Sequence, residues 1–324
     1  MFLDHLDELR YRQTEDVIEL VGRVARHLPG SALATCDDWH RLYCRALGVL
    51  GSALRQRERL RAANRALREA LFCAEVWQLR GEEARLLERA CYLVDDCGEP
   101  AEALRLADLA TRIYAGLHDM LGITRVLVDR GQILNRLGKA KDASRAFSEA
   151  LARLPANEVR NRAAAYTGFA NAEQKLGRLE VAENALEQAR QLADPREAMT
   201  SASLAYRQAE LAVARGELHE AEALYREARR LLAPECALDI ALVSLALCKT
   251  LLTLGNASEA EEVASAMVAL LIPLDRNKIA AAALSEFIKA AKSGKFSIET
   301  IDKTKKNLRR RSQLKETDLP RHSG

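Results

Sequence analysis

The chain repeats with a period of 39 to 40 residues, and this repeat limits its fold more than any other feature. A turn-forming residue recurs once in each period, an alanine follows five residues later, and a small or flexible residue follows seven further on. The turn position is held in order by Glu58, Gly98, Gly138, Gly177, Gly216 and Gly255. A period of this length indicates stacked supersecondary units, none of which buries its apolar face alone.

Each repeat is predicted to form two helices. Apolar residues have helical spacing on both sides of the turn, as with Tyr166 and Phe169 before Gly177, and Leu186 and Leu192 after it. A glycine at the turn supplies the left-handed backbone that ends the first helix. A small residue also recurs seven positions before the turn, where it lets neighbouring helices approach closely. These positions hold Gly51, Cys91, Gly131, Ala170, Ala209 and Cys248.

The repeat resembles the tetratricopeptide repeat (TPR). The clearest match is the spacing of Gly138, Ala140, Ala143, Phe147 and Ala150, and a second match begins at Gly216. The departure is the period, which is longer than the usual 34 residues. The resemblance implies an all-α fold, a right-handed α-solenoid of stacked antiparallel helix pairs. It also implies a concave groove, lined by the first helix of each pair, that binds proteins or peptides.

The repeat predicts four regions along the chain. Residues 1–30 are expected to form a degenerate helix pair, and residues 31–275 to form six TPR-like repeats. Residues 276–312 are expected to form a capping pair, because Glu299 replaces the recurring alanine and a terminal repeat needs a polar outer face. Residues 313–324 are expected to be a disordered basic tail.

Motifs and composition favour a binding protein over an enzyme. The chain has no glycine-rich phosphate loop, no His-Glu-x-x-His motif and no serine in a strand-to-helix elbow. We therefore expect no catalytic residue, no cofactor and no metal. The charged start does not fit a signal peptide, no apolar run could span a bilayer, and the odd number of cysteines argues against a disulfide framework. A cytoplasmic protein is expected, and the abundance of arginine, alanine and leucine indicates a bacterial source.

One cluster allows a metal-binding alternative. Cys36, His40 and Cys44 are spaced by four residues, so one helix could place all three on one face. Such ligands could hold zinc together with a fourth group. However, Asp37 or Asp38 is expected to cap this helix, which would leave Cys36 outside it. Cys44 also falls at a repeat position that belongs to the core, so we favour a structural role.

The predicted groove carries the candidate binding residues. Arginine lies thirteen positions before the first three turns, and tyrosine or amide side chains lie six and three positions before several turns. Such groups could hold the carboxylates and backbone of an extended peptide. The alternative is that the arginines pair with Glu88, Asp95 and Asp96. The candidate residues are Arg45, Arg85, Arg125, Tyr92, Gln132, Asn135, Asn171, Gln174 and Tyr206.

The function expected from these features is a non-enzymatic scaffold for another protein or an acidic peptide segment. One alternative is a peptide-sensing or regulatory subunit that acts on a separate effector or transcription regulator. A second is a nucleic-acid adaptor that uses the basic segment from Lys295 onward, because basic runs can track phosphates. We favour a solvated helix and a frayed tail for that segment, so neither nucleic acid nor membrane is an expected partner. The sequence does not specify the oligomeric state.

Overall fold

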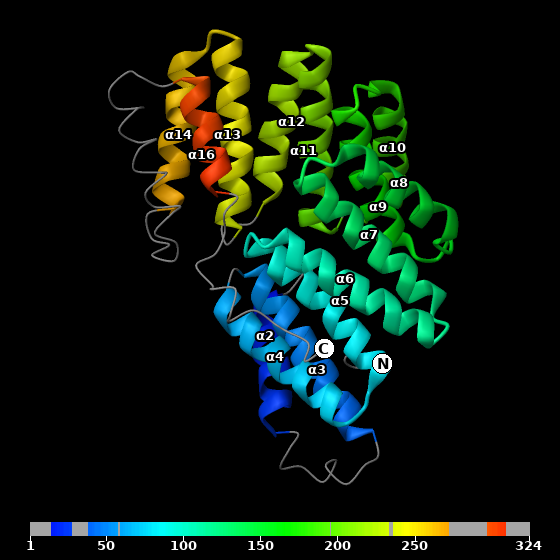
Figure 1. The fold of residues 1–324 in the computed structure, drawn as a ribbon. Coiled ribbons are helices and arrows are strands. Elements are labelled where there is room, and N and C mark those ends of the chain that lie inside the picture. The colour runs from blue at the N-terminus through cyan, green and yellow to red at the C-terminus, as the bar shows by residue number, and fades with distance from the viewer. Residues whose placement is uncertain are drawn as a thin grey trace. The chain divides into compact units, whose positions relative to one another are not determined.

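The structure, a computed structural model, describes residues 14–27, 38–57, 59–194, 196–232, 236–271 and 297–308. Every regular element in these ranges is an α-helix, which confirms the predicted fold class (Figure 1). The chain divides into two compact units. Of the described residues, those up to Gly138 and residues 152–154 belong to unit 1, and residues 139–151 and those from Pro155 onward belong to unit 2. No described helix is both long and apolar enough to cross a membrane.

Unit 1 is built from consecutive helices that pack in antiparallel pairs. Helix α3 pairs with α4, α5 pairs with α6, and α2 packs on α3. The first helices also contact one another, α3 with α5 and α5 with α7. The helices are α2 (Thr14–His27), α3 (Trp39–Gln56), α4 (Leu60–Val76), α5 (Arg80–Asp96), α6 (Pro100–Gly116) and α7 (Met120–Arg136).

Unit 2 continues the same arrangement. Helices α9 and α10, α11 and α12, and α13 and α14 form pairs, and the last described helix, α16, packs on α13. The helices are α8 (Ala140–Arg153), α9 (Val159–Lys175), α10 (Leu179–Leu192), α11 (Ala198–Arg215), α12 (Leu218–Leu231), α13 (Ala237–Thr253), α14 (Ala257–Leu271) and α16 (Ile298–Leu308).

The recurring glycines end the first helices as predicted. All five have positive φ, from 74° at Gly138 to 86° at Gly98. At Gly98 the amide donates to the carbonyl of Asp95 at 2.9 Å, and the Glu99 amide donates to the carbonyl of Val94 at 3.2 Å. These two bonds form a Schellman motif, which satisfies carbonyls that the end of a helix leaves without partners. Glu58, the first turn residue of the series, lies outside the described residues.

Two further left-handed residues were not expected from the sequence. Gln78 has φ 54° and His118 has φ 55°, at the ends of α4 and α6. The amide of the residue after each one makes the same hydrogen bond as at the glycine turns. The Leu79 amide donates to the carbonyl of Ala74 at 2.8 Å, and the Asp119 amide donates to that of Tyr114 at 2.9 Å. The turns between pairs in unit 1 therefore use the same motif without glycine.

The recurring small residues lie in the helix contacts. The alanines that follow each turn are at most 1% exposed, and they are Ala63, Ala103, Ala143, Ala182, Ala221 and Ala260. A Cβ atom at Gly51 would lie 2.7 Å from Cγ of Leu67, closer than packed atoms allow. The predicted close approach of helices at the small positions is confirmed at this residue.

The predicted region boundaries remain predictions. Helix α2 coincides with the second half of the expected N-terminal pair, and α16 with the second helix of the expected capping pair. Residues 272–296 and 309–324 lie outside the described residues, and with them the whole first helix of the expected capping pair and the whole of the expected basic tail.

Candidate functional site

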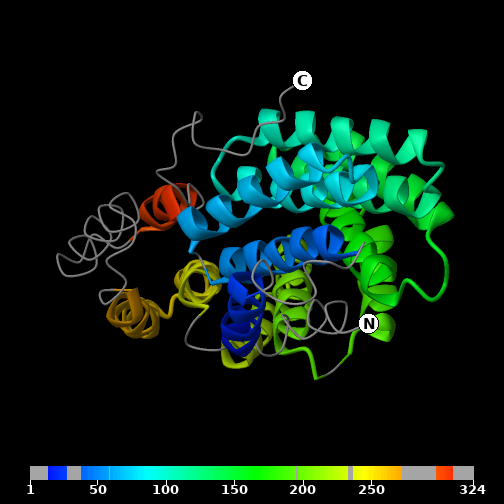
Figure 2. The same ribbon diagram turned by 90° about the horizontal axis from the view of Figure 1, so that it is seen from below.

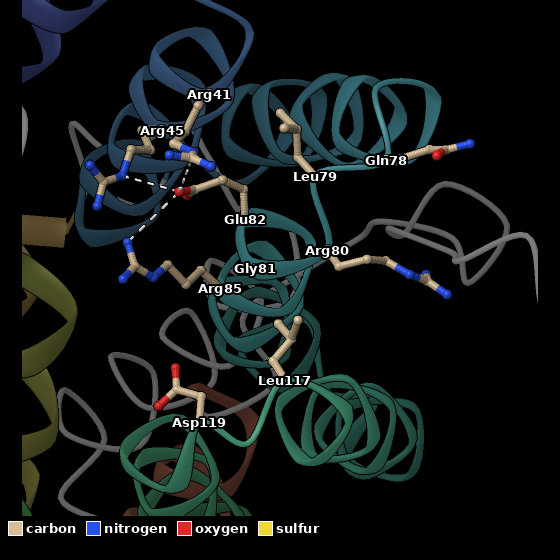
Figure 3. A pocket seen from close by; sticks show the side chains of 10 residues that line it. All are labelled: Arg41, Arg45, Gln78, Leu79, Arg80, Gly81, Glu82, Arg85, Leu117 and Asp119. Atoms are coloured by element: carbon tan, nitrogen blue, oxygen red, sulfur yellow. Dashed lines mark ion pairs between the residues drawn. The ribbon is translucent and has the colours of Figure 1, made fainter. Parts of the chain in front are cut away.

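Two of the three predicted groove arginines meet on one carboxylate in unit 1. Nε of Arg45, on α3, lies 3.4 Å from Oε1 of Glu82, and an Nη atom of Arg85, on α5, lies 3.9 Å from the same oxygen. Arg41, one turn before Arg45, reaches this oxygen at 4.0 Å. Figure 3 shows these three side chains converging on Glu82. We call the four residues the arginine cluster.

The arginine cluster lines a cavity of about 610 Å³. Four arginines and two carboxylates line it, so the wall carries more positive than negative groups. The lining residues are Arg41, Arg45, Gln78, Leu79, Arg80, Gly81, Glu82, Arg85, Leu117 and Asp119 (Figure 3). Two of the arginines also have partners beyond the lining: Arg41 pairs with Asp38 at 3.5 Å, and Arg80 with Glu83 at 2.9 Å.

The charged groups of the cluster differ in their access to solvent. Glu82 is the buried member, with its side chain 10% exposed, whereas those of Arg41 and Arg85 are 56% and 42% exposed. Asp119, across the cavity, is committed to the start of α7, where its side chain accepts from the Gly122 amide at 2.8 Å. The cavity therefore presents guanidinium groups that an incoming anion can reach, while its own carboxylates are engaged.

Arg125 occupies the same repeat position but a different environment. It lies 3.7 Å from Glu88, which also accepts a hydrogen bond of 3.0 Å from the hydroxyl of Tyr114. Burial lowers the pKa of Arg125, but Glu88 and Tyr114 outweigh it, and the net shift is upward. For this arginine the structure shows the internal pairing with Glu88 that the sequence left as an alternative. Asp95 and Asp96 have other arginine partners, Arg136 for both and Arg55 for Asp96.

The other groove candidates of unit 1 take part in a buried polar network. The Tyr92 hydroxyl donates to Asp129, which is 4% exposed, and the guanidinium of Arg55 lies 5.2 Å from the centre of the Tyr92 ring. Burial, followed by the nearby Glu88, raises the pKa of Asp129 well above its ordinary value. Asn135 is only 2% exposed and Gln132 is half-buried, so Asn135 offers little surface to a ligand.

In unit 2 the candidates contact neighbouring helices. Nε2 of Gln174 donates to the backbone carbonyl of Glu210 at 2.8 Å, and Asn171 is 8% exposed. The Tyr206 ring lies 5.6 Å from that of Tyr225, and Nζ of Lys305, on α16, lies 5.6 Å from the Tyr206 ring centre. Sequence patterns did not indicate this last contact, because α16 lies outside the regular repeats.

The residues of the metal-binding alternative have separate environments. Cys44 is fully buried, its thiol donates to the carbonyl of Ala70 at 3.7 Å, and burial raises its pKa to about 12. The His40 ring lies 4.6 Å from that of Trp39 and 4.1 Å from that of Trp77. Cys36 lies outside the described residues. Within those ranges no group of three histidine, cysteine or acidic side chains is placed to hold a metal.

Comparison with known proteins identifies the fold but no close relative. No family model and no curated protein sequence matches the chain. A solved Rap protein, in complex with Competence and Sporulation Factor, matches with a TM-score of 0.69 and 14% identity, over 95% of this chain and 86% of that one. A chain of the APC/C hetero-tetramer Cut9-Hcn1 matches with a TM-score of 0.46 and 14% identity, over 91% and 60%. The TPR2AB domain of yeast Sti1 matches with a TM-score of 0.30 and 13% identity, over 82% and 98%.

The sequence repeat, the glycine-ended first helices and the structural match point to one conclusion. The described helices stack in antiparallel pairs, and a solved structure shares this arrangement over nearly the whole chain. The protein has the all-α fold of the tetratricopeptide-repeat type.

Proposed function

We propose that the protein is a non-enzymatic, cytoplasmic binding module that captures an acidic peptide or protein segment at the arginine cluster of unit 1. The observation that carries the proposal is the convergence of Arg41, Arg45 and Arg85 on the single carboxylate of Glu82. The Rap structure was solved with a bound factor, so a protein of this fold is known in complex.

The mechanism we propose is an exchange of carboxylates. A ligand carboxylate that enters the cavity would take over arginine contacts that Glu82 now shares, because guanidinium groups bind carboxylates through paired hydrogen bonds. The apolar side chains of Leu79 and Leu117 line the same cavity and could contact the ligand's aliphatic part. Charge would give most of the attraction, so binding should weaken as salt concentration rises.

The test is a peptide-display selection on the full chain. We expect the enriched peptides to carry aspartate, glutamate or a free terminal carboxylate. Changing Arg45→Glu and Arg85→Glu together should abolish their binding, since each charge-assisted contact contributes roughly 1.5–3 kcal/mol. Arg145→Glu is the matched control, because its side chain on α8 is 80% exposed and lies outside the cluster. Enrichment of peptides without acidic groups, or unchanged binding by the double variant, would overturn the proposal.

A regulatory role is a more specific version of this proposal. Capture of the acidic segment would then change the activity of a separate effector or transcription regulator, which is the first alternative that the sequence offers. The nucleic-acid alternative gains less support. Lys305, one of the basic residues it would use, lies 3.9 Å from Glu210 within unit 2, and the basic residues from Arg309 onward lie outside the described residues.

A further inference from the structure

Helix α16 lies across first-helix positions of unit 2 that the repeat assigns to the groove. Nζ of Lys249, on α13, lies 2.8–2.9 Å from both carboxylate oxygens of Asp302. Nζ of Lys305 lies 3.9 Å from Oε1 of Glu210, on α11. Lys249 and Glu210 both lie six residues before a turn glycine, a predicted groove position. Figures 1 and 2 both show α16, in red, beside α13, in yellow.

The contacts of α16 follow one face of an amphipathic helix. Ile301 is fully buried in the same apolar cluster as Leu245 and Leu251, and Thr304 is 3% exposed. Asp302 and Lys305 flank this buried strip and reach opposite charges on two different helices. This face of α16 therefore presents an apolar anchor, Ile301, an acidic residue directly after it, Asp302, and a basic residue four positions after it, Lys305.

These contacts differ from those expected of a further repeat. In a regular stack, the second helix of a pair packs beside the preceding second helix, which here is α14. The ion pairs of α16 instead go to the first helices α11 and α13. The inner face of unit 2 thus holds a helix in the way that a groove holds an amphipathic helical ligand.

We propose that the inner face of unit 2 is a binding site for an amphipathic helix of a partner protein, and that α16 occupies it in the absence of that partner. The partner helix carries the same pattern as α16: an apolar anchor, an acidic residue directly after it and a basic residue four positions after it. Displacement of α16 is feasible because Lys249 and Asp302 are 45% and 53% exposed, and exposed ion pairs contribute little to stability. This site is separate from the arginine cluster, so either proposal can fail alone.

The test uses a fluorescein-labelled synthetic peptide of residues 297–308 as the probe, with fluorescence anisotropy on the full chain. Asp302→Lys in the protein weakens the internal helix, so we expect the peptide to bind this variant at least about fivefold more tightly than the wild type. Lys305→Glu is a second weakening variant and should act in the same direction. Equal affinity for all three proteins, or binding to none of the correctly folded ones, would overturn the proposal.

A charge exchange then locates the peptide. Combining Lys249→Asp with Lys305→Glu in the protein should reduce binding of the native peptide at least about fivefold relative to Lys305→Glu alone, and an Asp302→Lys peptide should recover it. Lys141→Asp, on an exposed position of α8, replaces Lys249→Asp in the matched control and should leave binding unchanged. Failure of the exchanged peptide to recover affinity would show that it binds elsewhere. Circular dichroism of each variant confirms that the helices are intact.

Discussion

At the scale of single residues, backbone conformation sets where the helices end. Glycine occupies the left-handed position after five first helices, and this recurrence could be predicted because glycine adopts positive φ without steric cost. Gln78 and His118 hold the same conformation without that advantage. They could not be predicted from sequence, because nothing in a glutamine or a histidine marks a helix end. At each of them the next residue donates the closing hydrogen bond of the turn, to the carbonyl of Ala74 and to that of Tyr114.

Gln78→Gly should stabilise the protein. The left-handed conformation costs a non-glycine residue roughly 1–2 kcal/mol, and the greater freedom of glycine in the unfolded chain offsets part of this gain, so we expect about 0.5–1 kcal/mol. Urea denaturation followed by circular dichroism measures the change. Gly98→Ala is the matched control and should destabilise, since φ is 86° there. A loss of stability in Gln78→Gly would contradict this explanation of the turn.

Asp129→Asn should stabilise the protein at neutral pH more than at pH 4. Burial raises the pKa of Asp129 in the folded protein well above the ordinary 3.8. Between these two values the unfolded chain releases the proton while the folded chain retains it, so stability from this group falls as pH rises. Asparagine has the same shape, accepts from Tyr92 and does not ionise. Urea denaturation at both pH values should show that the extra free energy of unfolding of the variant is larger at neutral pH. A difference in stability that does not change with pH would contradict a raised pKa of Asp129.

At the scale of helices, the apolar pattern predicted which helices pack together. The ion pairs between helices could be identified only from the structure. Alanine spacing is a local signal, since one residue per turn of helix meets the neighbouring helix. The partner of Arg45 is different, because Glu82 lies 37 residues away and meets it only when α3 and α5 pack side by side. The position of α16 could not be predicted either, because its sequence does not keep the full repeat pattern. The sequence therefore predicted a set of first-helix positions as a groove, but it did not predict which residues those positions contact.

Gly122→Ala should loosen the contact between α6 and α7. A Cβ atom at Gly122 would lie 2.4–2.6 Å from three ring carbons of Tyr114, which is 1% exposed and cannot move freely. Overpacking of this kind costs roughly 1–3 kcal/mol. Thermal denaturation measures the loss. Gly116→Ala is the control, because no atom lies within 4 Å of its added Cβ; an equal effect of both variants would contradict the steric explanation.

At the scale of the whole molecule, one repeat architecture supports two different surfaces. Unit 1 presents a cavity whose arginines exceed its carboxylates, and unit 2 holds a helix of its own chain on its first helices. The TPR-type fold, shared with the solved Rap protein, explains why side chains of successive first helices lie close together. The chemistry of each surface comes from residues that the repeat leaves variable.

Calorimetric titration of a display-selected acidic peptide into three forms of the protein tests the central claim, capture of a carboxylate by the arginine cluster. Glu82→Gln removes the internal carboxylate that shares the arginines, so it should bind more tightly than the wild type. The Arg45→Glu and Arg85→Glu double variant should bind the peptide at least about tenfold more weakly than the wild type. Higher salt should narrow the differences in affinity among the three proteins. Equal affinities, or weaker binding by Glu82→Gln, would contradict the account.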